Sequence, residues 1–171
     1  MRTVGFLNPM REMSAAMYIL RRELWVDRPI EEVFAFFADA HNLEKITPPW
    51  VGFKILSMST DSIEAGTIIR YRLRLHGIPV HWRTNICEWN PPYSFVDEQT
   101  RGPYKKWRHT HKFEAHGSRT KMMDEVQYLL PFGILGRIVH SLKVRKDVSR
   151  IFDYRRERIE GLFGQRGESA A

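Results

Sequence analysis

Two histidines, His109 and His111, stand two residues apart in a segment that alternates between charged and aromatic side chains. Successive residues of a β-strand point to opposite faces, so one face of this strand carries both imidazoles. The charged face must be the solvated one, which places both imidazoles where a sheet normally carries aliphatic side chains. The inward face holds Trp107, His109, His111 and Phe113, and the outward face holds Lys106, Arg108, Thr110 and Lys112.

The neighbouring segments add acidic and amide groups to the same interior. Between residues 93 and 99 the face that carries Phe95 turns polar, and between residues 120 and 130 one acid, Asp124, interrupts an apolar face. If residues 115–118 close a hairpin, strand parity places His111 opposite or nearly opposite Asp124. Buried polar groups need partners or a ligand. We therefore predict one aromatic-walled interior that contains Asp97, Gln99, His109, His111 and Asp124.

Three kinds of chemistry fit this set of side chains. Two histidines at alternate strand positions and one carboxylate, from Asp97 or Asp124, are the donor set of a metal site. His111 with Asp124 is also a general acid–base pair, because a carboxylate raises the basicity of an imidazole and orients its ring. The third interpretation is a hydrogen-bond network that fixes the strand register or anchors a ligand. We favour this network, and we expect neither a metal ion nor a cofactor.

The composition sets broad limits. A chain of 171 residues fits a single domain, and 43% hydrophobic residues is ordinary for a globular protein. Cys87 is the only cysteine, so no intrachain disulfide can form and nothing indicates an oxidising compartment. We expect a cytoplasmic protein with an irregular N-terminal extension at residues 1–16, one ligand-binding domain at residues 17–164, and a disordered tail at residues 165–171.

The chain is basic, with a formal net charge of +7 and a pI of about 9.8. Most basic residues fall at outward strand positions or on the last predicted helix, so a solvated surface accounts for them. We expect no nucleic-acid partner. We keep a transient membrane contact as an alternative, because residues 129–135 are apolar. No apolar run is long enough to span a membrane.

Hydrophobic periodicity predicts the elements that position these residues. A strand over 18–26 is followed by a helix that Asp27 caps and that carries Pro29 in its first turn, then by a short helix over 40–46. A helix over 135–163 ends the chain, with Gly161 and Gly164 as its stops. Between them lie six strands, over 51–58, 67–75, 78–89, 93–99, 104–114 and 120–130. The two-residue link His76-Gly77 sets Tyr71 opposite Trp82.

An antiparallel sheet of about seven strands with one apolar face must curve so that this face is covered. The last helix is long enough to fill the concave side of the sheet. The fold class is therefore α+β. The order of elements and three local sequences resemble the helix-grip superfamily, which takes in START lipid-transfer domains, the birch-pollen allergen family and polyketide aromatase/cyclases. The resemblance covers about residues 17–163, and within the superfamily it points to a small bacterial cyclase/dehydrase-like branch, some of whose members are labelled cell-division inhibitors. The sequences are residues 42–50 (NLEKITPPW), 102–104 (GPY) and 107–111 (WRHTH).

The resemblance implies a cavity between the sheet and the last helix, gated by loops at one end. Its wall and anchors imply a ligand with an apolar body and an oxygen-bearing end, such as a lipid, quinone or polyketide-like molecule. The predicted wall is Tyr71, Trp82, Phe95, Trp107, Phe113 and Tyr128, and the predicted anchors are Asp97, Gln99, His109, His111 and Asp124. The candidate gates are residues 47–52, 101–104 and 131–136.

We expect a protein that binds or carries a small hydrophobic ligand, as a monomer or homodimer, rather than an enzyme. The alternative is an aromatase/cyclase-like or dehydratase-like enzyme that uses His109, His111 or Asp124. A second alternative is a partner-binding module with a fully packed interior. A ligand-binding test separates the partner-binding module from the carrier and the enzyme, and a turnover assay separates the enzyme from the carrier.

Overall fold

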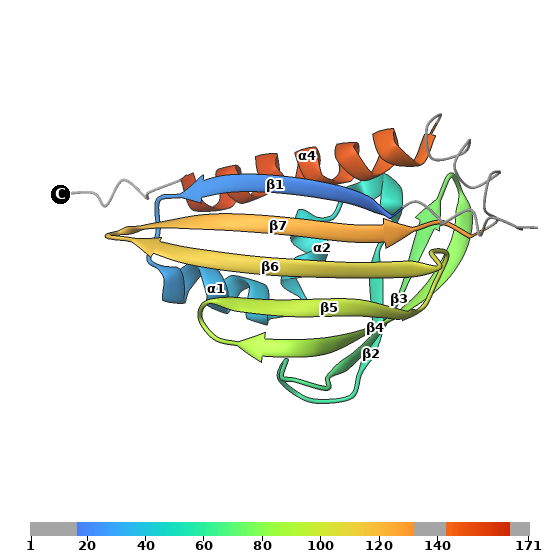
Figure 1. The fold of residues 1–171 in the computed structure, drawn as a ribbon, viewed down its shortest axis with the longest axis horizontal. Helices are drawn as coiled ribbons and strands as arrows, with labels where there is room; N and C mark the ends of the chain where they lie inside the picture. The colour runs from blue at the N-terminus through green and yellow to red at the C-terminus, as the bar shows by residue number, and fades with distance from the viewer. Residues whose placement is uncertain (1–16, 132–142, 165–171) are drawn as a thin grey trace, which may run out of the picture.

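A computed structural model describes residues 17–131 and 143–164, and it has the predicted α+β architecture with the helix-grip arrangement (Figure 1). Seven strands form one sheet, and the short helices follow the first strand. In chain order the elements are β1 (Tyr18–Val26), α1 (Ile30–Ala38), α2 (Asn42–Ile46), the 3-10 turn η1 (Pro49–Val51), β2 (Lys54–Met58), β3 (Ile68–Leu75), β4 (Ile78–Asn90), β5 (Ser94–Arg101), β6 (Lys106–His116), β7 (Arg119–Leu129) and α4 (Arg145–Gly164).

The sheet is antiparallel throughout, with the strand order β1-β7-β6-β5-β4-β3-β2. The predicted registers are confirmed: Tyr71 pairs with Trp82, and His111 pairs with Asp124. The β3–β4 turn is tight because His76 (φ 53°) and Gly77 (φ 83°) both adopt left-handed backbone conformations, as a two-residue hairpin link requires.

The helices bury their apolar faces against the inner face of the sheet. The apolar stripe of α1 is buried, and it packs with Phe95 and Phe113 of the sheet and with Ile159 and Phe163 of α4. Figure 1 shows α4 running along β1, with α1 and α2 behind the central strands. This packing places the ring of Phe152 of α4 5.3 Å from that of His109 on β6, between ring centroids. The buried α1 residues are Ile30, Val33, Phe34 and Phe37.

Several element boundaries differ from the predictions. Asp27 does not cap α1; it forms an ion pair with Arg119, and Pro29 occupies the N-cap position without a side-chain hydrogen bond. β2 starts at Lys54 rather than at 51, because Gly52 has a left-handed φ of 54° that ends η1. α2 begins at Asn42, two residues later than predicted. α4 continues through Gly161, so that glycine does not stop the helix, and Gly164 is the last residue that the structure describes.

Parts of three predictions lie outside the described residues: the N-terminal extension, the tail after Gly164, and most of the candidate gate and helix start between residues 131 and 142. Among the residues that the structure describes, no helix is long and apolar enough to cross a membrane.

Candidate functional site

A pocket of about 190 Å³ lies between the inner face of the sheet and α4. Most of its wall is apolar and aromatic, and its few polar groups include Asp97, His109 and His111. The aromatic wall is continuous, since Trp82 stacks on Tyr71 at 5.9 Å between ring centroids and meets Trp107 edge-on at 5.4 Å. The pocket therefore joins a large apolar surface to a small polar end.

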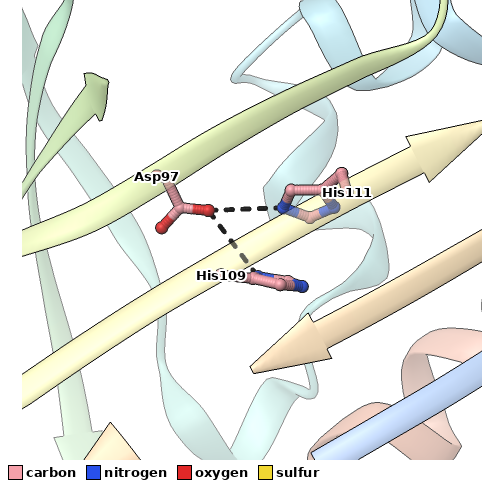
Figure 2. Close-up of side chains that lie close together, drawn as sticks. All are labelled: Asp97, His109 and His111. Carbon is pink, nitrogen blue, oxygen red and sulfur yellow. Dashed lines mark hydrogen bonds and ion pairs between the residues drawn. The ribbon is translucent and has the colours of Figure 1, made fainter. Parts of the chain in front are cut away.

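The strand pairing assembles this polar end. Asp97 of β5 pairs with His109 of β6, and Asp124 of β7 pairs with His111 of β6. All four side chains point to one face, so each imidazole lies between two carboxylates (Asp97 and both imidazoles are drawn in Figure 2). Figure 2 shows Asp97 facing both rings from β5. We call these four residues, Asp97, His109, His111 and Asp124, the tetrad.

The distances within the tetrad show which groups hydrogen-bond. Nε2 of His109 donates to Asp124 Oδ1 at 3.0 Å, and Nε2 of His111 donates to Asp97 Oδ2 at 3.3 Å. The second nitrogens lie close to the opposite carboxylates, with His111 Nδ1 at 2.8 Å from Asp124 Oδ1 and His109 Nδ1 at 3.6 Å from Asp97 Oδ2. His109 and His111 are 5% and 3% exposed, so water does little to screen these contacts.

Burial and neighbouring charges shift the pKa values of the two histidines in opposite directions. Burial lowers the pKa of His109, the charge of His111 adds to that effect, and the hydrogen bond to Asp124 does not offset them. Burial also opposes protonation of His111, but its contacts with Asp124 and Asp97 outweigh burial and raise its pKa. The tetrad thus favours the charged form of His111 over the charged form of His109.

Both carboxyl groups of the tetrad are held in the ionised form. Burial alone raises the pKa of Asp97, but the hydrogen bond from His111 and the charges of both histidines lower it. Burial is likewise overcome at Asp124, where the charge of Arg155 and the two histidines bring the pKa well below its usual value. Arg155, on α4, thereby becomes part of the electrostatics of this site.

Asp97, His109 and His111 could also hold a metal ion, because their ligand atoms all lie within 4.8 Å of one another. A metal needs unprotonated imidazole nitrogens, and Nε2 of His111 here bonds Asp97 Oδ2 at 3.3 Å. A metal ion bound there would have to break this hydrogen bond to Asp97.

We expect zinc to leave the melting temperature nearly unchanged, because the carboxylates of the tetrad already pair with its imidazoles. A metal site saturated at about 100 times its Kd would add about 2.7 kcal/mol of stability, which is a shift of several degrees at this size. Thermal unfolding across a zinc titration checks this, with His109→Gln as the control. A saturable rise that His109→Gln abolishes would establish a metal site.

Seven of the eleven predicted site residues line the pocket, and four do not. Gln99 turns away: its amide bonds the backbone N–H and C=O of Tyr104, and a Cβ on Gly102 would collide with it. Phe113 packs under α1 against Phe34 and Phe37. Asp124 contacts both histidines without lining the pocket, and Tyr128 packs against Trp107 without lining it. The seven that line the pocket are Tyr71, Trp82, Phe95, Asp97, Trp107, His109 and His111.

The sequence predictions missed several lining residues. Tyr104 was placed only in a gate, although its ring lies 4.7 Å from that of Trp107, and Thr84 donates a hydrogen bond to Asp97 at 3.2 Å. Phe37 also lines the pocket. Arg155 lines it from α4, and its helical spacing with the apolar residues Phe152 and Ile159 is the sequence signal that could have identified it. The aliphatic wall includes Val51, Ile69, Leu73, Ile86, Val148 and Ile151.

Comparisons with known proteins support the fold and the family. The family described as polyketide cyclase / dehydrase and lipid transport matches residues 26–150. No curated protein matches the chain. Among solved structures, TTHA0849 from Thermus thermophilus has a TM-score of 0.60 at 21% identity, and the match covers 85% of this chain and 99% of that one.

Two further solved structures are similar over most of their length. A START superfamily protein from Mycobacterium smegmatis has a TM-score of 0.61 at 14% identity, covering 84% of this chain and 98% of that one. The ZhuI aromatase/cyclase from Streptomyces sp. R1128 has a TM-score of 0.63 at 14% identity, covering 89% and 99%. At these identities the likeness shows the helix-grip fold alone, and the resemblance inferred from the sequence is confirmed at that level and at the level of the family.

Proposed function

The chain belongs to the polyketide cyclase/dehydrase and lipid transport family, and on that premise we propose that it binds one small hydrophobic or amphipathic molecule in the pocket between the sheet and α4. One observation carries the proposal: the apolar wall ends on Asp97, His109 and His111 of the tetrad, and both of these histidines are buried. A ligand with an apolar body and an oxygen-bearing end complements both parts. Residues 17–164 would form the single domain that holds it.

The size of the pocket limits the driving force. A ligand that buries roughly 200 Å² of apolar surface gains about 5 kcal/mol at ~25 cal/mol per Å², from which the cost of immobilising it must be subtracted. Polar contacts with the tetrad would then supply selectivity rather than most of the affinity. A volume of about 190 Å³ suits a molecule of two fused rings or a short acyl chain.

We expect freshly purified protein to release a small molecule under denaturing conditions, and Leu73→Trp to abolish this. Leu73 lines the pocket and is 7% exposed, so an indole there occupies ligand volume. Native mass spectrometry before and after organic extraction measures the bound mass, and quenching of Trp82 and Trp107 fluorescence measures rebinding. In the rebinding measurement we expect Leu73→Trp to lower the affinity by about tenfold or more, which corresponds to about 1.4 kcal/mol or more of binding free energy.

Ile78→Trp is the matched control for Leu73→Trp. Ile78 sits on the same hairpin but is 66% exposed and outside the pocket, so the same substitution there should leave binding unchanged. Equal binding by Leu73→Trp and wild type, or protein that carries no ligand and binds none from a lipid and quinone panel, would instead support the packed partner-binding module.

Catalysis is the second candidate function, and the opposite pKa directions of His109 and His111 favour it. A buried pair whose protonation states are pushed apart is the arrangement that acid–base enzymes use. A cyclase or dehydratase would move protons between the tetrad and a folded polyketone or enol. Here His111→Ala would lower turnover by about 10² or more while substrate still binds, whereas in a carrier it lowers affinity by a graded amount.

A further inference from the structure

The packed face of α4 carries a charged side chain where an apolar one would be expected. Arg155 lies between Phe152 and Ile159, which are 6% and 1% exposed, and it lines the pocket. Its guanidinium carbon lies 5.3 Å from the ring centroid of Phe37 and 5.9 Å from that of Phe152. These two rings flank the cation where Arg155 lines the pocket.

Two nitrogens of Arg155 are buried without a hydrogen-bond partner. Nε and Nη2 bond to none of the described residues, and Arg155 forms no ion pair in the part of the chain that the structure describes. Neighbouring arginines differ, since Arg156 of α4 pairs with Glu160 and Arg22 of β1 pairs with Asp153 of α4. Arg155 as a whole is partly exposed, but two buried N–H groups without a partner are costly, so they need a compensating role.

The identity of these two nitrogens indicates what would pair with them. Nε and Nη2 form one edge of the planar guanidinium, with two parallel N–H donors whose spacing matches the two oxygens of a carboxylate. Asp97 and Asp124 do not use this edge, because both already bond to the histidines of the tetrad. Resting on the proposed function, we propose that the molecule bound in the pocket is a hydrophobic acid whose carboxylate is held by Arg155 beside the tetrad.

A purely structural role for Arg155 makes a different prediction. Arg155 and Asp124 also line a second hollow of about 20 Å³, which shares Phe152 with the main pocket and has room for about one water molecule. If Arg155 serves only as a counter-charge for Asp124, replacing it would lower stability and change the affinity for charged and neutral ligands alike. Ligand selectivity therefore separates the two roles.

The test compares ligands that differ only at the polar end. The probes are 2-naphthoate with 2-naphthalenemethanol, and octanoate with 1-octanol, all of a size for the pocket. They are measured by quenching of the tryptophan fluorescence of Trp82 and Trp107 in the full chain. We expect wild type to bind each acid roughly 10- to 100-fold more tightly than its alcohol, the range for hydrogen bonds to a charged group.

Three variants assign that preference to Arg155. Arg155→Met should bring the ratio of acid affinity to alcohol affinity down to about one, and Arg155→Lys, which keeps the charge but not the two-donor edge, should restore part of the preference. Arg156→Met, an exposed neighbour on the same helix, should behave as wild type. The wild-type comparison stands even if Arg155→Met fails to fold.

The outcomes are distinguishable. Equal binding of acid and alcohol by wild type would overturn the carboxylate assignment and leave the proposed ligand-binding function intact. A preference that survives in Arg155→Met would overturn the role of Arg155. No binding of either member of either pair would count against the proposed function itself.

Discussion

Replacing Asp124 with alanine should lower the free energy of unfolding by about 3–5 kcal/mol, the usual cost of removing one partner of a buried charge pair. The carboxylate of Asp124 accepts from His109 Nε2, lies 2.8 Å from His111 Nδ1, and feels the charge of Arg155. Without it the raised pKa of His111 loses its main support, and Arg155 keeps a buried charge with no acid beside it. Urea unfolding at neutral pH measures the loss.

Two further variants separate charge from position. Asp124→Asn keeps an oxygen for the N–H of His109 but removes the charge, so we expect a loss between those of wild type and Asp124→Ala. Asp153→Ala removes an acid from α4 that pairs with Arg22 near the surface, and it should cost no more than about 1 kcal/mol. Equal losses for Asp124→Ala and Asp153→Ala would show that the tetrad is not a buried charge network.

The pH dependence of unfolding has a definite sign in each region. The lowered pKa of Asp124 means that its contribution is present above its unfolded value of about 3.8 and is lost as pH falls through the folded value. Because the pKa of His111 is raised, its contribution to the free energy of unfolding is fully present below the unfolded-state pKa of about 6.5. That contribution is lost as the pH rises through the folded-state pKa. Asp124→Ala should weaken this alkaline loss.

Much of the fold follows from local patterns that the sequence displays. Alternation alone placed His109 and His111 on an inward face, and a two-residue turn fixed Tyr71 opposite Trp82. A one-residue slip would expose every inward side chain, so parity and turn length together determine the register. The pairing of His111 with Asp124 on the next strand followed from the same parity.

The missed features depend on geometry that alternation does not contain. Gln99 has inward parity, but its amide bonds the backbone of Tyr104, in a position that a Cβ at residue 102 would contact. Asp27 looked like a helix cap, yet Arg119, distant in sequence, pairs with it. Parity identifies the face on which a side chain lies, whereas open space depends on how helices pack over that face.

Phe113 is an inward side chain that does not line the pocket. Replacing it with alanine should lower the free energy of unfolding by about 3–5 kcal/mol. Its ring is 2% exposed and packs against Phe34 and Phe37 of α1, each at 5.5 Å between ring centroids. Alanine leaves a cavity where α1 meets the sheet, and the close packing of three rings limits collapse. Chemical denaturation measures the loss.

Phe95→Ala is the matched partner, because Phe95 is also buried but lines the pocket and stacks on His111 at 4.0 Å between ring centroids. We expect both variants to lose stability, and only Phe95→Ala to lose affinity for a pocket ligand, when binding is measured where both proteins remain folded. Removing Phe95 takes away apolar contact with the ligand and a support of the imidazole, whereas Phe113 offers the ligand no surface. Equal loss of affinity in the two variants would mean that the ligand-binding region extends beneath α1, beyond the pocket between the sheet and α4.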